Sequence, residues 1–161
     1  MSKKTLLIIL GSGGHTAQML RLVRLLGNKF KYEYIIAKDD TLSEKKIEIP
    51  GKVWKATRPR SYDTPTWKAI VNTIVSFIES IHIITKTDAI AVVSAGPGLA
   101  VPISYLGKLF GKKVIFLESW SRVWHPSRAG KLVYPIADMF FVQWPELKEK
   151  YPKAIYAGRL G

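Results

Sequence analysis

The sequence contains no cysteine, which excludes disulfide bonds and thiolate-ligated metal sites and favours a reducing compartment. Acidic residues are also few, since 12 Asp and Glu stand against 25 Lys and Arg, for a net charge of +13. A chain this basic is expected to meet an anionic partner, such as a phosphorylated substrate, a phospholipid surface or a nucleic acid.

The sequence has one long uncharged stretch, but we do not expect it to span a membrane. Residues 89–107 are 19 consecutive uncharged residues, about the length of a span. Their centre is SAGPG, with a further proline at Pro102, and these residues break a helix where lipid-exposed backbone would find no partner. The chain also enters a strand-like run within five residues, which leaves no room for a signal peptide. We therefore expect a soluble protein of one domain, residues 1–161.

Apolar runs alternate with helical periodicity along the chain. Runs typical of buried strands lie at 5–10, 32–37, 52–56, 89–94, 113–118, 138–143 and 154–158. Helices are predicted over 15–26, 66–85 and 98–110, with a short one at 145–151. Apolar strands separated by helices indicate a parallel sheet covered on both faces. The predicted fold class is α/β, with a single Rossmann-like, doubly wound parallel sheet.

Ligands of such folds bind beyond the carboxyl ends of the strands, and the first such end reads LGSGGHT. Its glycines let backbone amides approach an anion, and the helix that follows adds free N–H donors. His15 closes the turn, where it can bind phosphate when protonated or act as a general base when neutral. The turn resembles a dinucleotide fingerprint, but Thr16 occupies the third glycine position. A phosphate site, a nicotinamide site and a turn without ligand all remain open here.

Two further strand ends carry candidate residues. In SAGPGLAVP, Gly96 and Gly98 bracket a proline at a helix start, and a second backbone donor nest of this kind suits a ligand with two phosphates. In ESWSRVWHPSRAGKL, Glu118 is either a catalytic acid or base or a structural partner of Arg122. Trp120 and Trp124 are four residues apart, a spacing that would align them on a helix.

Basic and aromatic residues are interleaved in the segment 52–68, a pattern typical of binding to nucleic acid or to an anionic bilayer. The helix predicted over 66–85 is apolar around much of its circumference. Such a helix is buried, docks a partner or meets lipid, and we expect core packing for most of its apolar residues.

Five segments together resemble a known family: LGSGGHTAQML, SAGPGLAVP, ESWSRV, GKLVYPIADMFFVQWPELKEKYP and YAGRL. They are similar, in the same order, to the acceptor-side subunit of the two-chain N-acetylglucosaminyltransferase of dolichol-linked oligosaccharide synthesis, and to its relatives in bacterial polysaccharide assembly. The resemblance covers residues 6–160 and implies the N-terminal half of a GT-B glycosyltransferase, with the sugar-nucleotide domain on a separate chain. Eukaryotic members carry an N-terminal transmembrane helix that this sequence lacks, so we expect a peripheral position at the cytoplasmic face of a membrane.

The resemblance implies transfer of N-acetylglucosamine from UDP to a polyprenyl-diphosphate-linked sugar, with no cofactor, no metal and no nucleic acid. His15 or Glu118 would be the base. The residues expected to bind the diphosphate are Ser12, Gly13, Gly14, Ser94, Gly96, Gly98, Ser119 and Arg122. Membrane contacts are expected at Arg58, Arg60, Trp67, Trp120 and Trp124, and contacts with the donor-binding chain at Ile155, Tyr156 and Leu160. A basic nucleic-acid-binding module and a stand-alone Rossmann oxidoreductase remain as alternatives.

Overall fold

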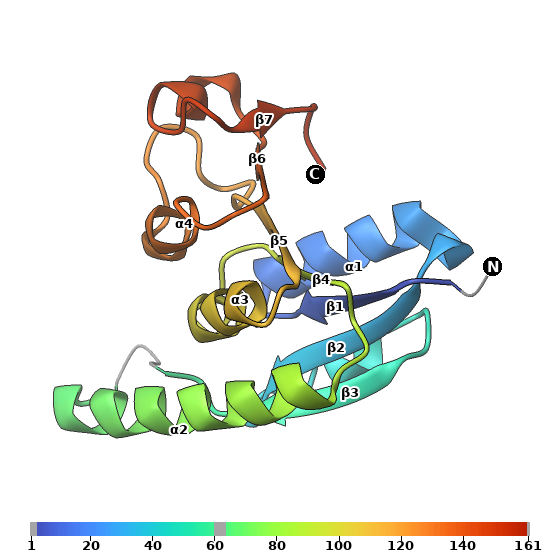
Figure 1. The fold of residues 1–161 in the computed structure, drawn as a ribbon. Helices are drawn as coiled ribbons and strands as arrows, with labels where there is room; N and C mark the ends of the chain where they lie inside the picture. Colours follow the sequence, from blue (N-terminus) through green and yellow to red (C-terminus); the bar gives the residue numbers. More distant parts are fainter. Residues whose placement is uncertain (1–2, 60–63, 161) are drawn as a thin grey trace.

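The computed structural model describes residues 3–59 and 64–160, and a seven-stranded, all-parallel sheet forms its centre (Figure 1). The strand order is β3-β2-β1-β4-β5-β6-β7. The strands are β1 (Thr5–Ile9), β2 (Lys31–Ala37), β3 (Lys52–Ala56), β4 (Ala91–Ser94), β5 (Lys113–Leu117), β6 (Met139–Val142) and β7 (Ile155–Tyr156). The predicted Rossmann-like sheet is confirmed, and the strand order reverses between β1 and β4, where such folds bind ligands.

The helices connect consecutive strands. They are α1 (Gly14–Leu26), α2 (Thr66–Lys86), α3 (Ala100–Leu109) and α4 (Arg128–Val133), with short 3₁₀ turns at Gly27–Lys29, Glu44–Lys46 and Pro145–Glu149. Trp120 and Trp124 do not lie on a helix, although their spacing would suit one, because residues 119–127 form turns, bends and irregular loop. The next helix, α4, begins only at Arg128, where the Ser127 hydroxyl accepts a hydrogen bond from the backbone N–H of Gly130 and caps the helix.

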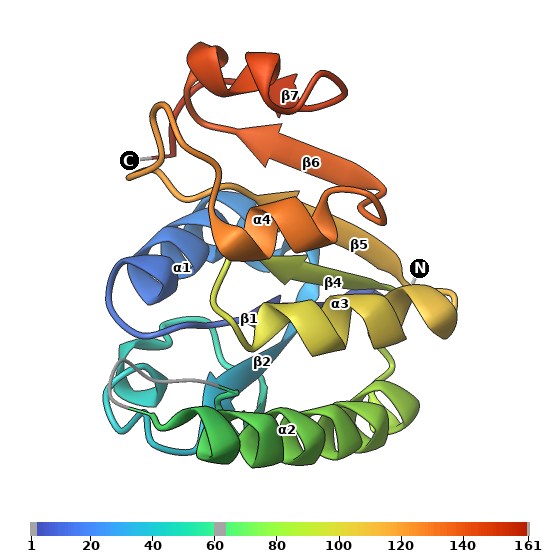
Figure 2. The same ribbon diagram turned by 90° about the vertical axis from the view of Figure 1, so that its left-hand side faces the viewer.

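The two faces of the sheet are covered unequally. Alternate side chains of β1 point to opposite faces, so that Ile8 packs in a cluster with Met19 of α1, whereas Leu7 packs in a cluster with Ile84 of α2 and Ile103 of α3. Figures 1 and 2 show α1 on one side of the sheet and α2, α3 and α4 on the other. The side that carries α1 therefore has less helix to cover it.

Helices cover both faces of the sheet, as expected, but the coverage is incomplete on the α1 side. Over β4, β5 and β6, that face remains open as an apolar groove of about 870 Å³. The groove is bounded by α1 and by the C-terminal segment 157–160. Its apolar lining includes Leu22, Leu25, Leu26, Phe30, Val93, Ile115, Leu117, Met139, Phe141 and Leu160.

Helix α2 reverses the usual arrangement of an amphipathic helix. Its buried residues are Ser76, Ser80, Ile83 and Ile84, and Ser80 donates a hydrogen bond to the carbonyl of Ser76. Its exposed residues include Trp67, Ile70, Val71, Ile74, Val75, Phe77, Ile78 and Ile81. The expectation of core packing for these apolar residues is therefore wrong. Among the described helices, α2 alone is long and apolar enough to span a membrane by length and composition.

Asp138 connects the start of β6 to β5 and α3 through a hydrogen bond and ion pairs, which stabilise the fold in a pH-dependent way. Its Oδ2 accepts a hydrogen bond from the backbone N–H of Val114 at 2.9 Å, and its carboxylate pairs with Lys108 and Lys113 at 2.9 and 3.0 Å. Burial alone would raise the pKa of Asp138, but these donors outweigh it and lower the pKa to about 2. Because the folded pKa lies below the unfolded value, the stabilisation is present above about pH 4 and is lost as the pH falls toward 2.

We expect Asp138→Asn to reduce the free energy of unfolding at pH 7 by about 1–3 kcal/mol, the usual cost of losing hydrogen bonds to a charged group. Chemical denaturation at pH 7 and pH 3 measures the effect, which should be smaller at pH 3. The matched control is Asp88→Asn, at an exposed aspartate. Equal stability of Asp138→Asn and the unmodified chain at pH 7 would contradict this role.

Candidate functional site

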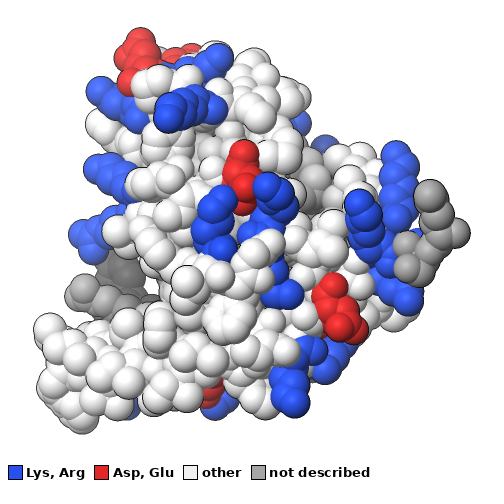
Figure 3. Space-filling view, viewed as in Figure 1, with Lys and Arg blue, Asp and Glu red and all other residues white. Residues whose placement is uncertain are grey.

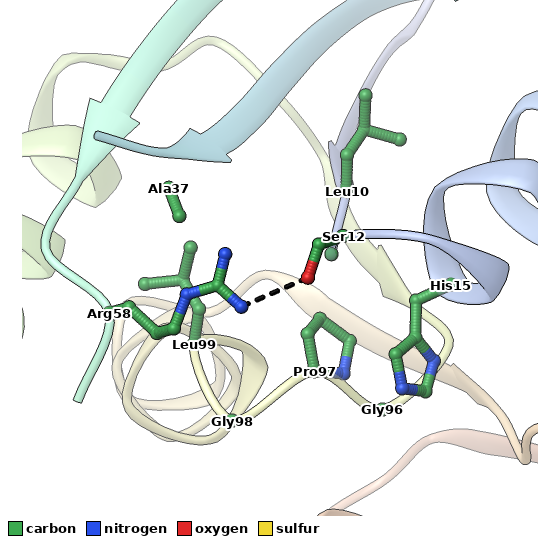
Figure 4. Close-up of a pocket in the computed structure, with 10 residues that line it drawn as sticks. Leu10, Ser12, His15, Ala37, Arg58, Gly96, Pro97, Gly98 and Leu99 are labelled. Carbon is green, nitrogen blue, oxygen red and sulfur yellow. Dashed lines mark hydrogen bonds between the residues drawn. The ribbon is translucent and has the colours of Figure 1, made fainter. Parts of the chain in front are cut away.

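The reversal of strand order brings two glycine turns together at the carboxyl edge of the sheet. One follows β1 and the other follows β4, and between them lies a pocket of about 190 Å³ (Figure 4). The pocket is lined by Leu10, Gly11, Ser12, His15, Ala37, Arg58, Gly96, Pro97, Gly98 and Leu99. Its volume is below the roughly 300–1,000 Å³ of typical small-molecule sites, so it can enclose only part of a larger ligand.

Both turns require glycine, the first because the turns approach closely and the second because of its backbone conformation. A Cβ atom on Gly11 would lie 2.8 Å from Cβ of Pro97, closer than side-chain carbons come. Gly96 has a φ of 95°, a left-handed conformation that residues with a side chain rarely adopt. The glycines therefore shape a site in which backbone groups can approach a ligand.

His15 lies in the first turn of α1 and lines the pocket beside the second glycine turn. Its Cε1 lies 3.8 Å from the position that a Cβ of Gly96 would occupy. Its Nδ1 is buried and has no hydrogen-bond partner in the described part of the chain. Burial lowers the pKa of His15. The interactions of the imidazole with the backbone of Ala95 and with the carboxylate of Glu118 raise this pKa, but their effect is smaller than that of burial. The imidazole is therefore neutral near pH 7 and able to accept a proton.

Arg58 also lines the pocket, although we expected it at a membrane surface. Its Nη1 donates a hydrogen bond to the Ser12 hydroxyl at 3.0 Å (Figure 4). Its Nε and Nη2 face Asp39 Oδ1 at 3.4 Å. The guanidinium thus joins the ends of β1, β2 and β3. Arg60, the neighbouring expected membrane contact, lies outside the described residues.

Glu118 directly follows β5 and is fully buried. Its carboxylate accepts four hydrogen bonds, from the Ser119 and Ser127 backbone N–H groups, the Ser127 hydroxyl and the Tyr151 hydroxyl, at 2.8–3.2 Å. Burial raises the pKa of the Tyr151 hydroxyl, which therefore remains a donor. The expected pair with Arg122 is absent from this set of contacts. The carboxylate is arranged to hold the surrounding chain, not to reach a ligand in the pocket.

The other expected diphosphate-binding residues surround the pocket at different depths. Ser12, Gly96 and Gly98 line it, and Gly13 and Gly14 begin α1 next to it. Ser94 and Ser119 are buried at the ends of β4 and β5. Arg122 is exposed and does not line the pocket, although its charge contributes to lowering the pKa of His15.

Apart from Arg58 and Trp120, the expected membrane and partner residues that the structure describes lie away from the pocket. Trp67 on α2 and Trp124 in the loop before α4 are exposed. Trp120 is half-buried, with its indole Nε1 3.6 Å from the position of a Cβ on Gly14, and it packs beside the first glycine turn. Ile155 and Tyr156 are exposed on the edge strand β7, and Leu160 lines the apolar groove.

Four residues important to this region were not singled out by sequence reasoning. Gln18 and Gln143 donate to the backbone carbonyl of Glu118 at 3.2 and 2.9 Å. Ser127 and Tyr151 hold its carboxylate. No local pattern identifies them, because each contact links residues from 9 to 100 positions apart. Within residues 3–59 and 64–160, no group of three or more His, Asp or Glu side chains is placed to hold a metal ion.

Comparison with solved structures shows which fold the chain shares. The chain is similar to Acinetobacter baumannii MurG, with a TM-score of 0.74, 12% identity and coverage of 98% of this chain and 44% of MurG. A UDP-N-acetylglucosamine 2-epimerase from Rickettsia bellii gives a TM-score of 0.75 at 10% identity, covering 99% of this chain and 46% of that protein. The fold is thus the Rossmann-like α/β fold of GT-B glycosyltransferases and related epimerases, and the chain spans less than half the length of these neighbours.

The sequence comparisons then identify the family. Residues 6–160 match the family described as "Oligosaccharide biosynthesis protein Alg14 like", and the chain belongs to this family. The mouse protein named UDP-N-acetylglucosamine transferase subunit ALG14 is 36% identical, over 96% of this chain and 82% of its own length. The Schizosaccharomyces pombe protein of the same name is 35% identical, over 97% and 83%.

The lowered pKa of His15 predicts a pH-dependent loss of stability. The unfolded chain binds a proton at His15 more readily than the folded chain, so stability falls as the pH drops below about 6.5. We expect His15→Gln to flatten the decline of the melting temperature between pH 7 and pH 5.5, a range above the usual titration of carboxylates. His125→Gln, at an exposed histidine, is the control. An unchanged slope for His15→Gln would show that His15 is not the titrating group.

Proposed function

We propose that this chain is the acceptor-binding subunit of a two-chain, inverting glycosyltransferase. Together with a separate donor-binding chain, it transfers N-acetylglucosamine from UDP-N-acetylglucosamine to a polyprenyl-diphosphate-linked sugar at the cytoplasmic face of a membrane. Membership of the family supports this proposal, because its relatives are named as UDP-N-acetylglucosamine transferase subunits. The observation that carries the proposal is the meeting of two glycine turns beside a neutral, partly buried histidine.

The diphosphate of the acceptor occupies the pocket at the start of α1. Backbone N–H groups at Gly13 and Gly14, and those of the turn at Gly96 and Gly98, bind its oxygens, aided by the helix dipole. Ser12 adds a hydroxyl at the pocket wall. Because the pocket is small, the sugar and the lipid extend beyond it, toward the donor-binding chain and the membrane.

His15 is the base in this proposal. The hydroxyl oxygen of the acceptor sugar attacks the anomeric carbon of N-acetylglucosamine while the bond from that carbon to UDP breaks, and His15 takes the hydroxyl proton. The configuration at the anomeric carbon inverts, and no covalent enzyme intermediate forms. Glu118 is a positioning residue, since its buried carboxylate holds the loop that faces His15. Arg122 stabilises negative charge at the mouth of the site.

The donor-binding chain docks along the C-terminal side of this chain. The apolar groove over β4–β6 is large, and Leu160 lines it. Exposed apolar patches of this size on a soluble surface mark interaction sites. Ile155 and Tyr156 extend the apolar surface at the edge of the sheet. The second chain, when bound in this groove, covers the part of the sheet that α1 leaves exposed.

The membrane surface is the second exposed apolar surface, on α2. Its apolar side chains follow helical spacing from Trp67 to Ile81 along one side of the helix. Figure 3 shows a predominantly white, uncharged surface over the amino end of α2. Lys68 and Lys86 stand near the two ends of the helix, where they can meet anionic headgroups. We propose that α2 lies in the plane of the membrane with its apolar side inserted.

The first test of this function is reconstitution. We expect the purified chain alone to transfer no N-acetylglucosamine, and addition of the donor-binding chain to produce transfer to a prenyl-diphosphate-linked sugar. His15→Gln should lower kcat of the complex by about a hundredfold or more while leaving its assembly intact, as expected for loss of a general base.

The groove supplies a matched pair of variants for the same assay. Leu25 lies in the groove on α1 and is 68% exposed, whereas Leu109 on α3 is 77% exposed and outside the groove. Leu25→Arg should weaken binding of the donor chain by at least tenfold, and Leu109→Arg should not. Transfer by this polypeptide without a second chain, or equal binding of both variants, would overturn the corresponding part of the proposal.

The second test concerns α2. We expect the double variant Ile74→Glu and Ile78→Glu to lower binding to anionic phospholipid vesicles by at least tenfold, because charged groups resist insertion among acyl chains. Flotation with vesicles of anionic and of neutral lipid measures the effect. Leu132→Glu, which changes an exposed leucine on α4, is the control. Vesicle binding that survives the double variant would place the membrane contact elsewhere.

A further inference from the structure

Among the described residues that line the pocket, Arg58 is the only one whose side chain carries a full positive charge at pH 7. The other titratable lining residue is His15, whose pKa is lowered by burial, so it contributes no positive charge near neutral pH. Backbone N–H groups of the glycine turns supply partial charges only. An anion in this pocket therefore has Arg58 as its one direct contact that carries a full positive charge.

The present partners of the Arg58 guanidinium are weak. Asp39 faces it at 3.4 Å, and the Asp39 side chain is 57% exposed, so water screens the pair. The remaining contact is a neutral hydroxyl, that of Ser12, at 3.0 Å. With its side chain only 26% exposed, Arg58 is oriented over the pocket. Its charge also helps to lower the pKa of Asp40, but among the described residues no hydrogen bond or ion pair joins the two, so its direct contacts leave its nitrogens available to a ligand.

The backbone that carries Arg58 is, by contrast, firmly placed. The preceding residue, Thr57, donates from its backbone N–H to Glu79 on α2 at 2.5 Å and from its hydroxyl at 3.2 Å. Lys38 pairs with the same carboxylate and donates from its backbone to Ala56 at the end of β3. The backbone of Arg58 is therefore held in place, whereas its guanidinium can exchange its present partners for others. This arrangement suits a residue that binds a charged ligand.

We propose that Arg58 is the diphosphate-binding arginine of this site. On binding, its guanidinium leaves Asp39 and forms a two-pronged contact with phosphate oxygens, while Asp39 holds it over the empty pocket at other times. The inference rests on the proposed function, because it takes the pocket to be the diphosphate site. It also reassigns a residue that the sequence pattern attributed to the membrane surface.

Calorimetric titration of the full chain with geranyl diphosphate and with inorganic diphosphate tests the proposal. Arg58→Gln should weaken the binding of both diphosphates by tenfold or more. Arg58→Lys should weaken binding by less, but its affinity should stay below that of the unmodified chain, because lysine keeps the charge and loses the two-nitrogen contact of the guanidinium. The control is Arg24→Gln, which removes an equal charge from an exposed arginine paired with Glu48 at the far end of α1. It should leave both affinities within twofold. Unchanged melting temperatures establish that each variant is folded.

The outcomes separate the two levels of inference. If the unmodified chain binds either diphosphate and Arg58→Gln binds it equally well, Arg58 is not the diphosphate residue, although the proposed function stands. If the unmodified chain binds neither, the pocket is not a diphosphate site, and both inferences fail. If Arg58→Gln loses anionic vesicle binding and keeps diphosphate binding, Arg58 belongs to the membrane surface. Stronger binding of geranyl than of inorganic diphosphate identifies a lipid diphosphate as the source of the recognised group.

Discussion

The buried carboxylate of Glu118 is the interaction on which the rest of this region depends. A carboxylate removed from water is costly unless donors surround it, and here four donors do so. They fix the loop after β5, the start of α4 and the turn that carries Tyr151. Gly130 is part of the same constraint, because a Cβ there would collide with the carboxylate and with the Tyr151 hydroxyl. The backbone carbonyl of Glu118 extends the network through Gln143, whose side chain also accepts a hydrogen bond from the N–H of Leu160. One residue thus connects the loop facing His15 with the C-terminal segment that borders the groove.

The molecule leaves two apolar surfaces uncovered, one on each side of the sheet. Of the helices in the described residues, α1 alone packs on one face, and this leaves the groove over β4–β6 open. On the other face α2 contributes two buried serines and two buried isoleucines, so most of its apolar side chains point outward. Burial of apolar area contributes most to folding, and a chain that forgoes this much of it is suited to burying the same area against partners. The small pocket at the carboxyl edge of the sheet also leaves room for a partner, because it can enclose only part of a ligand.

Much of the fold was predictable because its signals are local. The runs of apolar residues identify all seven strands, and the glycine turn before His15 marks both the end of β1 and the start of α1. The proximity of the two glycine turns also followed, since ligand sites of parallel sheets gather at their carboxyl edge. The pairing of Glu118 was not predictable, because Ser127 and Tyr151 reach it from other elements. The four-residue spacing of Trp120 and Trp124 would align them on a helix, but spacing alone does not say whether the backbone is helical, and here it is not.

The sequence by itself determined the α/β class, the order of the elements, the family and the glycine–histidine turn at the end of the first strand. Each of these depends on residue type and spacing along the chain, which require no knowledge of neighbours in space. Only the tertiary structure decided the direction of α2, because helical spacing shows where the apolar side of a helix lies but not whether that side faces the core, and small serines proved to be the residues that pack. It also decided the place of Arg58, which the basic composition of its segment assigned to the surface. Its contact with Ser12 joins residues 46 positions apart, and only the pairing of β1, β2 and β3 brings them together.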